Sequence, residues 1–166
     1  INLIEISRSS KLRLAVAHDN RMRRTSDMAQ GHNAVVAING TFSNMREGNS
    51  TCFYKVDKEL IDSTTAYEAA IRVNGAVHLL GRKVRILDWT RDIERNYKGN
   101  KGTVLAAGPI MLEDGHKADW SECDEGFIKT KHPRSAIYTT RDGKVVLLTV
   151  DGRSSGNAAG MSIPEL

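Results

Sequence analysis

The sequence predicts an α+β domain, built mainly from an antiparallel or mixed sheet of consecutive hairpins with few helices. Short apolar stretches with strand-like alternation recur along the chain, and turns rich in Gly, Asn and Asp separate them. The regular alternation of strands and helices that marks a doubly wound parallel sheet is absent. A chain of 166 residues can bury one core, so we expect a single domain over residues 1–166.

The first elements along the chain alternate between strand and helix patterns. Apolar residues at 3–6 and 12–16 flank a polar turn and predict a hairpin. Residues 25–30 predict a short helix that ends at Gly31. The compact apolar run at 34–38 predicts a buried strand.

The middle of the chain carries turn signals between apolar runs. Residues 52–61 fit a strand, a polar turn and a second strand. Asn74-Gly75 is the favoured pair of a type I′ turn, so we expect a hairpin there. Residues 86–96 fit a strand or a helix.

The last elements are a polar loop, a strand and a hairpin. Residues 97–102 predict the loop and residues 103–107 the strand. Residues 136–150 predict two strands joined at Asp142-Gly143. Because this hairpin would bring its two ends together, we expect His132, Arg134, Asp151 and Arg153 to converge on one cleft.

Composition excludes several classes of protein. With 40% hydrophobic and 27% charged residues the chain is of the globular type. The longest apolar run, at 145–150, is too short to span a membrane. The net charge is +4, but the basic residues lie in short groups without interleaved aromatic residues, so we expect no nucleic-acid partner.

Cysteine and histidine spacing argues against a structural metal site. Cys52 and Cys123 are too few for a zinc site and could either pair in an oxidising compartment or remain two unrelated buried thiols. No two of the remaining histidines share metal-ligand spacing: His18, His32, His78 and His116. The sequence identifies no cofactor.

Polar, glycine-containing segments follow three apolar stretches, at residues 39–44, 108–109 and 151–156. Each is either a turn or a cradle in which backbone N–H groups bind an anion. They match neither a P-loop nor a dinucleotide fingerprint. His132-Pro133-Arg134 precedes a predicted strand and is either an exposed loop or a pair of phosphate-binding side chains.

Four blocks together resemble the phosphodiester glycosidase family. They are residues 37–42 (AINGTF), 107–109 (AGP), 132–137 (HPRSAI), and 149–153 (TVDGR) with 160–162 (GMS). They occur in family order and cover residues 34–166. The resemblance implies a hydrolase that removes a sugar joined through its anomeric carbon to a phosphodiester, such as N-acetylglucosamine-1-phosphodiester, outside the cytoplasm in a periplasmic, secreted or lumenal setting.

With that resemblance in hand, the chemistry of a departing phosphate suggests roles for individual residues. Arg134 and Arg153 would bind the phosphate, and His132 would transfer a proton or contact the phosphate. Asp151 would act as nucleophile, base or carbocation stabiliser, and a divalent cation beside it is compatible with the pattern. Further residues are expected to bind substrate or order the site: Asn39, Gly40, Gly108, Gly152 and Gly156.

Two other functions fit the same residues. One is a non-catalytic carbohydrate-binding module with this fold. The other is a hydrolase of glycerol-phosphate or sugar-phosphate polymers from a cell envelope. A sugar-phosphate or glycan is the expected partner in each case, and no feature of the sequence indicates the oligomeric state.

The last residues predict the start of a helix. Ser162 and Glu165 have capping-box spacing, with Pro164 in the first turn. The family pattern also continues beyond this block, into a helix and an Asn-Leu-Asp-Gly-Gly-Gly-Ser segment. We therefore expect the domain to continue past Leu166.

Overall fold

The computed structural model describes residues 1–19 and 21–166. The described chain forms two compact units. Unit 1 contains Ile1–Leu12 and Pro109–Leu166, and unit 2 contains Arg13–Gly108. Strands in both units pair antiparallel, and the described helices are short, which confirms the α+β class with a mainly antiparallel sheet.

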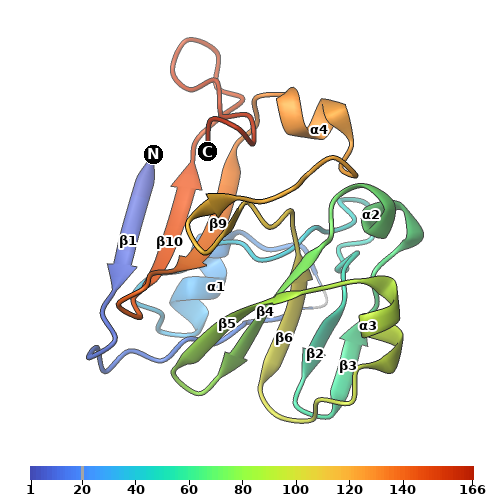
Figure 1. Cartoon of the computed structure of the whole chain (residues 1–166). Helices are drawn as coiled ribbons and strands as arrows, with labels where there is room; N and C mark the ends of the chain where they lie inside the picture. The colour runs from blue at the N-terminus through green and yellow to red at the C-terminus, as the bar shows by residue number, and fades with distance from the viewer. Residues whose placement is uncertain (20) are drawn as a thin grey trace. The chain divides into compact units, whose positions relative to one another are not determined.

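Unit 1 is organised around a three-stranded sheet in the order β1-β10-β9. The strands are β1 (Asn2–Ile6), β9 (Arg134–Thr139) and β10 (Val145–Val150). Figure 1 shows β10 between the other two strands. Val145, Val146, Leu147 and Val150 are buried, as expected for a central strand.

The predicted pairing of residues 3–6 with residues 12–16 is wrong. Residues 12–16 form no strand, and β1 pairs with β10 from Asn2↔Thr149 to Ile6↔Val145. The physical reason is that β10 is apolar at every position but Thr149, and that its edge away from β9 needs a partner strand. That edge satisfies the backbone groups of β1 in a continuous ladder.

The predicted hairpin over residues 136–150 is confirmed. β9 and β10 pair from Val145↔Thr139 to Val150↔Arg134. Gly143 takes φ +83° in the connecting turn, and its N–H donates to Thr140 O. The two strands therefore place the residues before Arg134 next to those after Val150.

The rest of unit 1 consists of short elements that we did not predict. β7 (Leu112–Glu113) and β8 (His116–Lys117) form a two-stranded ladder. Helix α4 (Glu125–Lys129) begins where the Asp124 side chain accepts from Phe127 N. Ile163, in the last turn of the chain, is buried and donates its N–H to Ile128 O of this helix.

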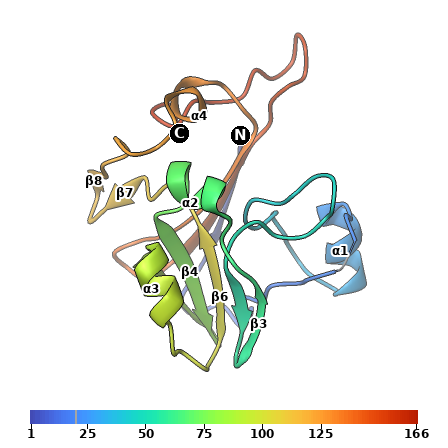
Figure 2. The ribbon, with the colours of Figure 1, turned by 90° about the vertical axis from the view of Figure 1, so that its right-hand side faces the viewer.

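Unit 2 contains a five-stranded sheet in the order β3-β2-β6-β4-β5. Figure 2 shows β4 and β6 side by side, as their pairing from Gly75↔Ala107 to Leu79↔Thr103 requires. The strands are β2 (Tyr54–Val56), β3 (Glu59–Asp62), β4 (Gly75–Leu80), β5 (Lys83–Asp88) and β6 (Thr103–Ala107). The predictions for residues 52–61 and 103–107 are therefore confirmed.

The core of unit 2 surrounds a buried carboxylate. Its apolar residues are Cys52, Phe53, Val73, Ala76, Trp89, Val104 and Ala106. Glu94 lies on helix α3 (Arg91–Asn96), and its carboxylate accepts from Thr64 N, Thr64 Oγ1 and Trp89 Nε1. Arg91 Nη1 donates to the same carboxylate at 2.9 Å. This group of residues is called the Glu94 network below.

Two local predictions in unit 2 are wrong. Asn74-Gly75 is not a hairpin tip, because Gly75 is the first residue of β4 and pairs with both Asp88 and Ala107. The turn is instead at Gly81, which takes φ +61° between β4 and β5. Residues 34–38 form no strand, and Val35 is 81% exposed. Apolar sequence makes a strand only where a neighbouring strand pairs its backbone.

The helix predictions are partly confirmed. Helix α1 (Thr25–Gly31) matches the predicted helix. Residues 86–96, which fitted either class, divide into the end of β5 and helix α3, with Thr90 accepting from Ile93 N as the N-cap. Helix α2 (Ala66–Ile71) was not predicted, although Thr65 and Glu68 have capping-box spacing.

Candidate functional site

The open end of the β9–β10 hairpin brings His132 and Arg153 together. Arg153 Nη2 lies 3.1 Å from His132 Nδ1, although the chain separates them by 21 positions. Arginine nitrogens only donate, so Nδ1 must accept and the imidazole carries its proton on Nε2. This end of the hairpin therefore presents a guanidinium and an imidazole N–H donor.

Arg153 adopts an unusual backbone conformation. Its φ is +59°, in the left-handed region that residues with a Cβ seldom occupy. Gly152 precedes it and packs so closely that a Cβ would lie 2.6 Å from Pro133 N and 2.9 Å from Gly160 Cα. The glycine allows three backbone segments to approach, and this approach directs Arg153 toward His132.

His132 is held through its backbone. Its N–H donates to Met161 O at 3.1 Å, and Met161 N donates to His132 O at 2.9 Å. Gly160 takes φ +91°, and a Cβ there would collide with the carbonyl of His132. The Gly-Met-Ser block thus supports the histidine by close backbone packing.

The side chain of Arg134 is buried, with 9% of the residue exposed. Arg134 pairs with Val150, and paired residues on antiparallel strands share a face. Its Nε donates to Met161 O at 2.9 Å, and its Nη2 donates to Phe127 O at 3.0 Å and Thr130 O at 2.9 Å. Its guanidinium also lies 4.7 Å from the centre of the Phe127 ring.

Asp151 directly follows β10 and is exposed. Within residues 1–19 and 21–166 its carboxylate makes no hydrogen bond or ion pair with another side chain. Of the predicted catalytic residues, the structure joins the side chains of His132 and Arg153. It places Arg134 against α4 and Met161.

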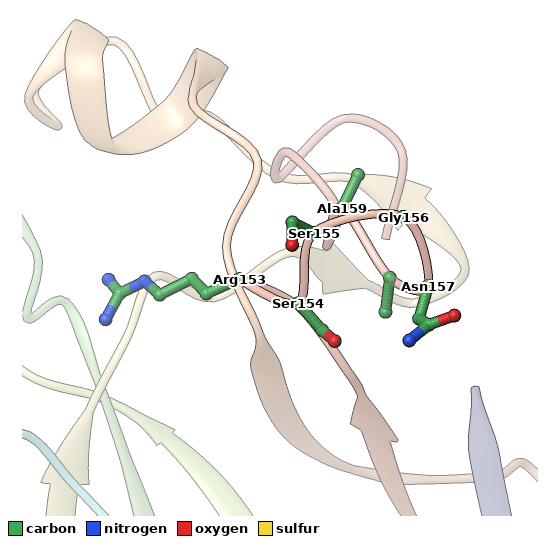
Figure 3. Close-up of a pocket in the computed structure, with 7 residues that line it drawn as sticks. Arg153, Ser154, Ser155, Gly156, Asn157 and Ala159 are labelled. Atoms are coloured by element: carbon green, nitrogen blue, oxygen red, sulfur yellow. The ribbon is translucent and has the colours of Figure 1, made fainter.

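A loop beyond Arg153 surrounds an open hollow. The hollow is lined by Arg153, Ser154, Ser155, Gly156, Asn157, Ala158 and Ala159. Figure 3 shows the Arg153 side chain extending away from Gly156 and Asn157. Ser154 N donates to Ala158 O, and Gly156 takes φ +80° with nothing within 4 Å of the position that a Cβ would occupy. Gly156 therefore serves the turn and leaves its surroundings open.

The other predicted substrate-binding residues lie in unit 2. Asn39 and Gly40 are exposed. A Cβ at Gly40 would lie 3.1 Å from Leu105 Cδ2, whereas one at Gly108 would collide with Arg72 O. Gly108 is therefore explained by close backbone packing, and binding of substrate by these residues stays a prediction.

Glu68 and Arg72 of unit 2 were missed by the sequence reasoning. Arg72 lies 5.3 Å from the ring centre of Phe42, a residue of the Asn39-containing block. Its Nη1 is 3.6 Å from Glu68 Oε2. Burial raises the pKa of Glu68, and the charge of Arg72 partly opposes this shift. The signals that could have identified them were the capping-box spacing of Thr65 and Glu68 and the i,i+4 spacing of Glu68 and Arg72, the residue that follows α2.

The two cysteines are free thiols. Cys52 is fully buried in the core of unit 2, and this burial raises its pKa. Cys123 is half-buried in unit 1, and burial raises its pKa as well. Of the two alternatives left by the sequence, the structure therefore contains two separate thiols.

Neither a metal cluster nor a membrane helix is found in the part of the chain that the structure describes. No three His, Cys, Asp or Glu side chains in it are grouped as metal ligands. None of its helices is long and apolar enough to cross a membrane.

Comparison with known proteins identifies a family for this chain. The model of a protein family described as phosphodiester glycosidase matches residues 32–166. No curated protein matches the sequence. The family match includes the hairpin, both of its flanking blocks and the Gly-Met-Ser segment.

Proposed function

The chain belongs to the phosphodiester glycosidase family, and on that premise we propose that it hydrolyses the bond between a sugar's anomeric carbon and a phosphodiester. The observation that carries the proposal is the contact of 3.1 Å between His132 and Arg153. The contact presents donors to an anion at a position inside the matched region. N-acetylglucosamine-1-phosphodiester is the substrate we propose to test first.

The chemistry requires stabilisation of negative charge. In the overall reaction the bond from the anomeric carbon to the phosphate oxygen breaks and its electron pair leaves with a phosphate monoester, while the hydroxyl of a water molecule joins that carbon and the remaining proton of the water passes to a base or to the monoester. Guanidinium and imidazole donors stabilise that departing charge. Arg153 is suited to this role because its planar fork can bind two phosphate oxygens.

His132 would add a donor from the other ring nitrogen. Because Nδ1 accepts from Arg153, the imidazole proton is on Nε2, and in this proposal that N–H donates to a phosphate oxygen. Asp151 lies two positions before Arg153 and is exposed. We propose that its carboxylate supports the anomeric carbon, as nucleophile, general base or charge stabiliser.

A product assay tests the proposal. Methyl and glyceryl diesters of N-acetylglucosamine 1-phosphate are incubated with the protein, and free sugar, sugar phosphate and glycerol phosphate are quantified. A glycosidase releases free N-acetylglucosamine with the phosphate monoester of the alcohol. Release of sugar 1-phosphate instead, or binding of the diester without any product, contradicts the proposal. These outcomes favour the polymer hydrolase and the binding module respectively.

Arg153→Ala is the variant that links the assay to the site. We expect kcat/KM to fall by about 100- to 1,000-fold, as on removal of a donor to a developing anion. Arg141→Ala is the matched control, since Arg141 is an exposed arginine at the opposite end of the same hairpin. Equal activity in the two variants would place the phosphate elsewhere.

The location of the protein follows from the same proposal. Family resemblance supports an extracytoplasmic setting, in which diesters of envelope or secreted glycans are accessible. Fractionation of cells that express the full-length gene, with detection of the protein by antibody, tests this point.

A further inference from the structure

Arg134 connects three segments of unit 1. Its Nη2 donates to two carbonyls at the end of α4, Phe127 O and Thr130 O. Its Nε donates to Met161 O. The guanidinium also lies over the Phe127 ring, so that helix contacts it through both its backbone and a side chain.

The carbonyl of Met161 is shared by two donors. It accepts from Arg134 Nε at 2.9 Å and from His132 N at 3.1 Å. Met161 N donates back to His132 O. A displacement of Met161 would therefore move the backbone of His132, and with it the imidazole that contacts Arg153.

The environment of Arg134 explains how a buried cation is tolerated there. Carbonyl oxygens at the C-terminal end of a helix carry partial negative charge, and two of the three acceptors are of this kind. These acceptors engage the Nε and Nη2 donors on one side of the fork. A lysine has neither the planar geometry nor the paired directions needed to reach them together.

We propose that Arg134 is a positioning residue that fixes His132 through Met161, and that it does not bind the phosphate. The proposal rests on the function proposed above, since the positioned groups are His132 and Arg153. It assigns separate roles to two arginines with similar positions in the sequence pattern. Arg153 contacts the anion, whereas Arg134 holds Met161 and thereby the backbone of His132, whose imidazole contacts Arg153.

The first experiment starts from the ligand-free protein and follows its arginine Nε–H signals by ¹⁵N NMR during a titration. Inorganic phosphate is the probe. We expect the Arg134 signal to exchange slowly with water and to keep its position at saturating phosphate, while the Arg153 signal shifts. If the Arg134 signal moves with the same apparent Kd as that of Arg153, Arg134 is a phosphate ligand and the proposal is overturned.

The second experiment compares Arg134→Lys with Val146→Ala. Val146 is a fully buried residue of β10 that pairs with Tyr138 and Glu5, so its truncation destabilises the same sheet without touching His132. In Arg134→Lys we expect the ¹⁵N signals of His132 to lose the single Nε2–H tautomer. We also expect kcat to fall about 100-fold, as for a small misplacement of a catalytic group.

The control separates positioning from general loss of stability. Val146→Ala should keep the His132 signals and, at a temperature where it is folded, the wild-type kcat. If Arg134→Lys also keeps the His132 tautomer, the positioning role is wrong. If the wild-type protein turns over no diester, the proposed function fails, whereas the NMR measurements still decide the role of Arg134.

Discussion

The Glu94 network and the His132–Arg153 pair are both polar, but they differ in burial and in strain. The Glu94 carboxylate lies inside unit 2 and accepts hydrogen bonds from Thr64 and Trp89 as well as from Arg91. The His132–Arg153 pair is more accessible and depends on a left-handed backbone conformation at Arg153. A buried, satisfied network serves stability, whereas an accessible and strained pair is typical of a functional site.

The largest expected effect is a loss of stability when the Glu94 network is disrupted. Glu94→Ala leaves the donors of Thr64, Trp89 and Arg91 without their shared acceptor. We expect the free energy of unfolding to fall by about 3 kcal/mol or more, because the buried donors of Thr64 and Trp89 lose their acceptor. Urea denaturation followed by tryptophan fluorescence measures it. Asp92→Ala on the same helix is the control, because its ion pair with Arg95 is exposed and should contribute under about 1 kcal/mol.

The second prediction concerns the glycine that supports the site. Gly160→Ala should cost about 2 kcal/mol or more, because it combines an unfavourable φ with a collision against His132. Gly156→Ala is the matched control, with a similar φ of +80° and open surroundings, and should cost about 1 kcal/mol. The difference in stability between the two variants, measured by thermal unfolding, gives the contribution of the close packing of Gly160 against His132. Equal losses of stability would show that this packing is unimportant.

The third prediction separates stability from function at Arg153. Glycine relieves the strain of the left-handed conformation but adds conformational freedom to the unfolded chain. The relief of strain is slightly larger than the entropic cost, so Arg153→Gly should be more stable than wild type by roughly 0.5 kcal/mol. Turnover of a sugar phosphodiester should nevertheless fall as far as in Arg153→Ala. If Arg153→Gly lost stability as well as activity, Arg153 would have a structural role like that of Glu94, and the prediction would be wrong.

The smallest expected effect is at an exposed carboxylate next to the site. Glu165 pairs with Lys131 and accepts from Ser162, and these contacts lower its pKa from 4.5 to about 2. A lowered pKa in the folded state contributes stability above the unfolded value, and this contribution is lost as the pH falls toward 2. In Glu165→Gln, Tm should therefore be slightly lower than in wild type at pH 6. The difference should disappear near pH 2, and a difference that grew on acidification would contradict the assignment.

Local sequence was sufficient where an element is defined by neighbours in the chain. The hairpin around Asp142-Gly143 was predictable because a glycine turn joins two apolar strands directly. Half of the predicted capping box also forms, since Ser162 N donates to the Glu165 carboxylate. The contact of His132 with Arg153 followed from the same hairpin, which brings its two flanks together.

Local sequence failed where pairing is distant. Residues 12–16 and 34–38 have strand-like composition, yet neither finds a partner strand in the described chain. β1 instead pairs with β10, at the far end of the sequence. Asn74-Gly75 resembled a turn, but Gly75 is held between two strands. Strand propensity is realised only when tertiary structure supplies backbone partners.

The sequence by itself therefore determined the α+β class, the last hairpin, the family and the nearness of His132 and Arg153, because these follow from local periodicity, turn chemistry and motif order. Only the tertiary structure distinguished the two arginines. Arg134 and Arg153 are alike in charge and in their place beside the hairpin, but Arg134 is buried and donates to backbone carbonyls, whereas Arg153 is exposed and reaches His132. Burial and the identity of a hydrogen-bond acceptor depend on segments distant in the chain, which local patterns do not encode.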